Sequence, residues 1–87
     1  MVKYNMFMKK NLSSRDPSVP WEIRFRLTHD MRIAFPNIII NIRNYIYNDD
    51  QGEYVRWAVH SSYKKARRQF YMLQAEAVNP LISGFNY

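Results

Sequence analysis

The sequence contains no cysteine, which excludes both a disulfide framework and a zinc site built from thiolates. Its two glycines, Gly52 and Gly84, are too few for a glycine-rich phosphate-binding loop. No run approaches the roughly 18 consecutive apolar residues that a membrane span needs, and the opening stretch lacks the long apolar segment of a signal peptide. We therefore expect an intracellular protein with no membrane span, associated with a nucleoid, a nucleus or a virion.

Acidic residues are also scarce. With 13 Lys and Arg against 7 Asp and Glu, the formal net charge is +6 at pH 7. Such an excess favours a polyanionic partner, with nucleic acid as the first candidate and an anionic membrane surface as the second. A chain of 87 residues buries a limited share of its surface, so we also expect self-association into a homodimer.

The sequence offers little for catalysis. His29 and His60 are isolated, and no cluster of His, Asp and Glu has the spacing of metal ligands. Ser61 follows His60, but neighbouring residues of a strand point to opposite faces and form no proton relay. Asp49 and Asp50 fall in a turn, where Asp commonly bonds the nearby backbone. We expect no catalytic residue, no metal and no cofactor, and hence no enzyme.

The N-terminal part is predicted to be an arm followed by strands. Residues 1–18 are basic and end in a polar, turn-rich stretch, which indicates a flexible arm, although Met1, Met6, Phe7 and Met8 could dock part of it on the body. Residues 21–28 alternate between apolar and polar side chains, and residues 31–35 do so over a shorter distance; this period of two is typical of half-buried strands. Pro20 could instead begin a helix, so the choice between strands and a helix over residues 20–35 stays open, with strands favoured.

A hairpin is predicted next. Ile38–Tyr47 forms its first strand, NDDQG its turn and Glu53–His60 its second strand. The apolar side of the second strand would consist of Val55, Trp57 and Val59. A turn loop of two residues and one of four residues would both bring the apolar residues of the two strands to one face of the hairpin. The two-residue loop pairs Tyr47 with Tyr54, and the four-residue loop pairs Ile42 with Trp57.

The last element is a helix whose start is capped by Ser61 or Ser62 and which stops at Asn79 and Pro80. Its apolar residues, Ala66, Phe70, Leu73 and Ala77, follow helical spacing. The sequence thus predicts an α+β domain over residues 19–80, in which an antiparallel sheet of three to four strands is packed by one C-terminal helix, with a tail over residues 81–87.

Basic and aromatic side chains share the polar side of the predicted sheet. This mixture is typical of sites for single-stranded nucleic acid, where cations bind phosphates and aromatic rings stack on bases. Like charges opposite each other destabilise a sheet, so an Arg43–Arg56 pair makes sense if phosphate lies between them. More cations lie on the outer face of the helix. The predicted nucleic-acid-binding residues are Arg24, Arg26, Arg43, Tyr45, Tyr47, Tyr54, Arg56, Lys64, Lys65, Arg67 and Arg68.

One segment resembles a known family. The run INIRNYI at residues 40–46, followed by the acidic turn Asn48–Glu53, is similar to the core strand and turn of the positive-cofactor-four family of single-stranded-DNA-binding transcriptional coactivators. The resemblance implies several antiparallel strands with a C-terminal helix, a dimer formed through the helices, and DNA binding on the sheet by Arg43. Ile46 stands where that family has an aromatic residue, so stacking would move to Tyr45 or Tyr47. The family's Lys-Gly-Ile segment before the helix is also missing, since VRWAVHSS stands in its place.

Two functions are therefore expected, in this order. The first is non-specific binding of single-stranded nucleic acid by the basic and aromatic sheet face. DNA is favoured, RNA stays open as a partner, and transcription or replication is the expected setting. The alternative is a small basic structural subunit of a large assembly, such as a ribonucleoprotein, virion or organellar complex, in which neighbours order the arm and the tail.

Overall fold

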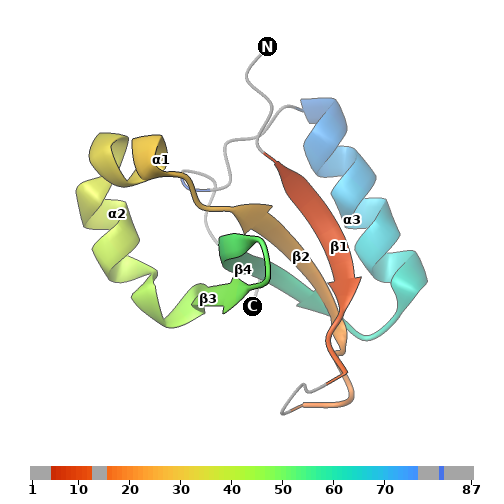
Figure 1. Cartoon of the computed structure of the whole chain (residues 1–87). Helices are drawn as coiled ribbons and strands as arrows, with labels where there is room; N and C mark the ends of the chain where they lie inside the picture. The colour runs from red at the N-terminus through yellow and green to blue at the C-terminus, as the bar shows by residue number, and fades with distance from the viewer. Residues whose placement is uncertain (1–4, 13–15, 77–80, 82–87) are drawn as a thin grey trace.

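The fold is one antiparallel sheet with helices packed against one of its faces (Figure 1). The computed structural model describes residues 5–12, 16–76 and 81. The sheet has four strands in the order β1-β2-β4-β3, namely β1 (Met6–Lys10), β2 (Trp21–Arg26), β3 (Ile46–Asp49) and β4 (Gly52–His60). Short helices α1 (His29–Ala34), α2 (Pro36–Asn41) and the 3-10 turn η1 (Arg43–Tyr45) connect β2 to β3, and α3 (Tyr63–Glu76) follows β4. The expected α+β class, a sheet packed by a C-terminal helix, is confirmed.

Strand β1 lies inside the segment that was predicted to be a flexible arm, so the sheet begins before residue 19. It pairs antiparallel with β2, with Met6 opposite Phe25 and Met8 opposite Ile23. Met6 and Met8 pack against the core, which gives this edge strand the apolar side that holds it on the sheet. The remainder of the predicted arm includes residues 1–4 and 13–15, which lie outside the described residues.

Residues 29–34 form helix α1, so the short strand predicted over residues 31–35 is wrong. The Thr28 hydroxyl accepts a hydrogen bond from the Met31 backbone N–H at 3.2 Å and caps the first turn. Asp30 in that turn complements the helix dipole. Residues 20–35, for which the sequence left strands and a helix open, thus contain a strand followed by a helix.

The predicted strand over Ile38–Tyr47 is also wrong for most of its length. Pro36 occupies the start of α2, a position where its missing N–H costs nothing. Ile39 and Ile42 are 7% and 6% exposed, whereas Ile40 is 57% exposed. This spacing of three belongs to a helix. Consecutive isoleucines satisfy either period, and the helix start at Pro36 decides between them.

The second hairpin has the shorter of the two predicted loops. Tyr47 pairs with Tyr54 and Asp49 with Gly52, which leaves a two-residue loop of Asp50 and Gln51. Gly52 has a φ of 123°, a conformation that other residues rarely adopt. The pairing expected for a four-residue loop, Ile42 with Trp57, does not form because Ile42 lies outside β3.

A bulge in β4 changes which side chains face the core. Ile23 pairs with Ala58 and the next residue, Arg24, pairs with Arg56, so Trp57 is an extra residue on β4. After the bulge, the side chains of β4 that face the core are shifted by one residue. Val59 is opposite Glu22 on the polar side, and His60 turns to the helix side, where its ring contacts Gln69 of α3. Val59 therefore lies on the side of the sheet opposite to the one predicted.

Helix α3 agrees with its predicted start. The Ser62 hydroxyl accepts a hydrogen bond from the Lys65 backbone N–H at 3.3 Å, which makes Ser62 the N-cap. Ala66 and Leu73 are buried and Phe70 packs against the core, as the helical spacing predicts. The predicted end at Asn79 and Pro80 lies outside the described residues.

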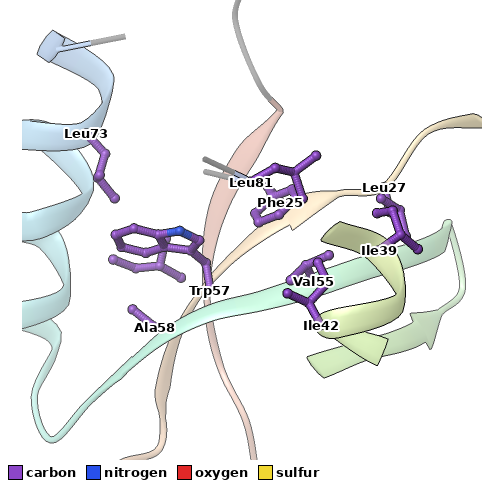
Figure 2. Packing of buried hydrophobic residues seen from close by; sticks show 10 residues of the cluster. Phe25, Leu27, Ile39, Ile42, Val55, Trp57, Ala58, Leu73 and Leu81 are labelled. Carbon is purple, nitrogen blue, oxygen red and sulfur yellow. The ribbon is translucent and has the colours of Figure 1, made fainter. Parts of the chain in front are cut away.

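The core lies between one face of the sheet and the helices (Figure 2). Phe25 and Val55 are fully buried in the sheet, and they belong to one cluster with Leu73 of α3 and Ile39 of α2. Leu81, from the predicted tail, joins the same cluster and is 4% exposed. Both α2 and α3 therefore cover the same side of the sheet.

The helical spacing of the isoleucines can be tested directly. Ile39→Ala should lower the free energy of unfolding by about 2–4 kcal/mol because it removes buried methyl groups and leaves a cavity. The matched control Ile40→Ala should change it by less than about 0.5 kcal/mol. Urea unfolding followed by circular dichroism gives both values, and a larger loss for Ile40→Ala would restore the strand in place of α2.

Candidate nucleic-acid interface

The sheet face opposite the core gathers basic, acidic and aromatic side chains, and we call it the polar face. The arginines predicted on β2 and β4 lie there, as do two of the predicted tyrosines. Strand register defines its members as Phe7 and Lys9 on β1, Glu22, Arg24 and Arg26 on β2, Tyr47 and Asp49 on β3, and Tyr54 and Arg56 on β4.

Glu22 pairs with two arginines at the centre of the polar face. Its side chain is 1% exposed, and its two carboxylate oxygens lie 2.7 Å from Arg24 Nη2 and 3.6 Å from Arg56 Nη1. The Asn11 amide also donates to Glu22 at 2.9 Å. Arg24 and Arg56 are direct cross-strand partners, an arrangement that would destabilise the sheet without a countercharge. A carboxylate therefore has the role that the sequence suggested for phosphate, and Arg24 rather than Arg43 faces Arg56.

Arg26 is neutralised by the turn of the second hairpin. Both of its terminal nitrogens donate to the Asp49 carboxylate at 2.6 Å. Hydrogen bonding to Arg26 lowers the pKa of Asp49 from 3.8 to about 2, and the same bond raises the pKa of Arg26. Asp49 is thus more than a turn residue, since it anchors β3 to the end of β2.

The aromatic rings of the polar face stack on its own arginines. The Arg24 guanidinium lies 4.2 Å from the centre of the Tyr54 ring, and Arg56 lies 5.0 Å from that of Tyr47. The two tyrosine rings stack on each other at 5.8 Å. Tyr54 is 7% exposed, and burial raises the pKa of its hydroxyl. These contacts leave little ring surface for a nucleotide base.

Two of the predicted residues lie off the polar face. Tyr45 packs against the core, and Arg43 is exposed at the start of η1. Both are displaced because residues 38–45 form helical turns instead of a strand. The sheet position that the family resemblance implied for Arg43 is therefore not the one that Arg43 occupies.

The remaining predicted cations lie together on α3. Lys64, Lys65, Arg67 and Arg68 are all exposed, and within the described part of the chain none of them forms an ion pair. Tyr63 and Tyr71 are 51% and 56% exposed on the same helix. We call these four cations and two tyrosines the helix surface.

Sequence reasoning missed both tyrosines of the helix surface. Helical spacing alone would have placed Tyr71 near Arg67, whose guanidinium lies 5.3 Å from the Tyr71 ring centre. Hydrogen bonding to Tyr71 raises the pKa of Arg67. The position of Tyr63 depends on the tertiary fold, because its ring packs edge-on against Trp21 at 5.1 Å.

Other kinds of site find little support. In the described ranges, no three His, Asp or Glu side chains are placed to hold a metal ion. None of the described helices combines the length and the apolar character needed to cross a membrane.

Comparison with known proteins gives no relative: the chain matches no protein-family model, no curated protein and no solved structure. The resemblance to the positive-cofactor-four family stays a prediction.

Asp49→Asn should remove a pH-dependent contribution to stability. The pKa of Asp49 is about 2 in the folded chain and ordinarily 3.8, so the folded state binds fewer protons between these values. The ion pair therefore stabilises the fold above about pH 4, and this contribution disappears as the pH falls through about 2. The variant should melt at a lower temperature than the unaltered protein at pH 7, and the difference should shrink below pH 4.

Thermal melting followed by circular dichroism from pH 7 to pH 2 measures this effect. Asp50→Asn is the matched control, because Asp50 lies in the same turn and forms no ion pair with another described residue. A difference between Asp49→Asn and the unaltered protein that stays constant with pH would contradict the assignment.

Proposed function

We propose that this protein binds single-stranded nucleic acid without sequence preference, through the helix surface. The observation that carries the proposal is the division of charge. Arg24, Arg26 and Arg56 of the polar face are paired with Glu22 or Asp49. The four cations of α3 are exposed and form no ion pair with a described residue, so they can bind phosphates without first breaking one.

The position of these cations on α3 also favours an anionic partner. Lys64 and Lys65 lie in the first turn of the helix, where the helix dipole is positive, and Arg67 and Arg68 follow in the second turn. Lys64 and Arg68 are four residues apart, so their like charges repel each other. A bound phosphate would offset both the unfavourable dipole interaction and the repulsion between like charges. Release of its counterions would also contribute to the binding free energy.

The exposed tyrosines favour single strands over duplexes. Bases of a single strand are free to stack on aromatic rings, each contributing on the order of 1–3 kcal/mol. Tyr63 and Tyr71 lie beside the cations and expose about half of their surface. Phosphates and ring faces occur in every nucleotide, so contacts of this kind carry no sequence preference.

Arg68→Gln should weaken the binding of a fluorescent oligothymidine and make it less dependent on salt. Loss of one phosphate contact should reduce the slope of log affinity against log salt concentration by about 0.7. Fluorescence anisotropy at several salt concentrations measures both quantities. Arg43→Gln is the matched control, since Arg43 is equally an exposed arginine without an ion pair to a described residue.

The same pair of variants distinguishes the two candidate interfaces. A loss of affinity in Arg43→Gln with no change in Arg68→Gln would contradict the helix surface and favour the site implied by the family resemblance. Absence of salt-dependent binding in the unaltered protein would contradict nucleic-acid binding itself.

Homodimerisation, and the alternative role as a subunit of a large assembly, are supported by a different observation. Ile33 of α1 and Ile40 of α2 are 66% and 57% exposed, although a small soluble domain gains by covering large apolar side chains. Either a second copy or a neighbouring subunit would cover them.

Light scattering after size-exclusion chromatography should give the mass of a dimer. The double variant Ile33→Asp/Ile40→Asp should give the mass of a monomer, because a charge cannot be buried in an apolar contact without a partner. The double variant Asn37→Asp/Asn41→Asp adds the same charge at exposed polar positions of α2 and should remain dimeric. A monomeric unaltered protein would contradict the homodimer, and an insoluble or polydisperse one would favour the assembly subunit.

A further inference from the structure

A groove of about 340 Å³ crosses one end of the polar face, on the opposite side of the sheet from α3. It runs between β1 and the loop of the β3–β4 hairpin. Its walls combine an aromatic ring, both signs of charge and two carboxamides, supplied by Asn5, Phe7, Lys9, Arg26, Asp50 and Gln51, with Asp49 beside Arg26.

A planar cation forms a fixed surface in this groove. The Arg26 guanidinium is bound through two nitrogens to Asp49 at 2.6 Å and lies 4.8 Å from the centre of the Phe7 ring. The Gln51 backbone N–H donates to the same Asp49 carboxylate at 2.9 Å, which fixes the hairpin loop relative to Arg26. Phe7 covers one face of this guanidinium and the side chain is 16% exposed, so a nucleobase would stack on the remaining surface that Arg26 presents to the groove.

The rim of the groove carries groups that remain available to a ligand. Asp50, Gln51, Asn5 and Lys9 are exposed. In the described part of the chain, neither Lys9 nor Asp50 forms an ion pair. Because Asp49 is already occupied by Arg26, the free carboxylate of the groove is that of Asp50.

We propose that this groove binds a guanine base, with its phosphate toward Lys9. Guanine presents two adjacent donors on its Watson–Crick edge, N1–H and the N2 amino group, and one carboxylate accepts both. The corresponding edges of adenine and cytosine offer one amino donor beside an acceptor, and that of thymine or uracil offers one donor between two acceptors, so each places an acceptor against Asp50. The base stacks on Arg26, its edge meets Asp50, and Lys9 binds the phosphate. This site goes beyond the proposed function, because the helix surface has no base preference.

Guanosine and adenosine monophosphates are the probes for this site. The two share ribose and phosphate, so they differ at the base alone. Isothermal titration should show GMP binding about tenfold more tightly than AMP, in the range expected for one bidentate contact to a base. Asp50→Asn should remove this preference by weakening GMP about tenfold, with AMP unchanged. The matched control Asp30→Asn, an exposed acid at α1, should retain the preference.

A second arm distinguishes a free nucleotide from a guanine within a strand. An oligothymidine with one central guanine should bind more tightly than plain oligothymidine, and Asp50→Asn should abolish that difference alone. Equal affinities for GMP and AMP, or no binding of either, would overturn the guanine site. That outcome leaves the salt-dependent binding of oligothymidine intact if the helix surface is correct, so the two proposals fail separately.

Discussion

The buried carboxylate of Glu22 is the interaction on which the polar side of the sheet depends. Two arginines approach it from neighbouring strands, and those arginines in turn lie against the rings of Tyr54 and Tyr47. Removal of one partner from such a buried set leaves an uncompensated charge and typically costs about 3–5 kcal/mol. Glu22 therefore allows Arg24 and Arg56 to lie opposite each other on neighbouring strands.

These ion pairs make the arginines of the sheet different from the cations of α3. On the sheet, the three arginines of β2 and β4 are paired with two carboxylates, Glu22 of β2 and Asp49 of the hairpin turn. The exposed start of α3 retains its positive charge. The four cations of α3 are exposed and form no ion pair with a described residue, whereas the arginines of β2 and β4 are paired. Composition alone cannot show this, since paired and unpaired cations count equally in a net charge.

The sequence predicted the elements whose pattern fits one period only. Strand β2, the β3–β4 turn and helix α3 are of this kind, and the structure confirms the predicted type of each element. Residues 38–42 fit both periods, and the outcome depends on the start of a helix at Pro36 that the alternation does not reveal. For the site, alternation correctly placed Arg24, Arg26 and Arg56 on one face. Their partners were harder to foresee: Glu22 lies two residues from Arg24 on the same side of β2, whereas Asp49 reaches Arg26 only through tertiary folding.

The bulge at Trp57 has a consequence for the molecule as a whole. A strand that leads into a helix delivers that helix to whichever side its last residues face, and the extra residue in β4 turns His60 to the apolar side just before α3 begins. The start of α3 therefore emerges over Trp21 and the core, away from Glu22 and its arginines. One inserted residue thus keeps the paired arginines of the polar face and the exposed cations of α3 on opposite sides of the sheet.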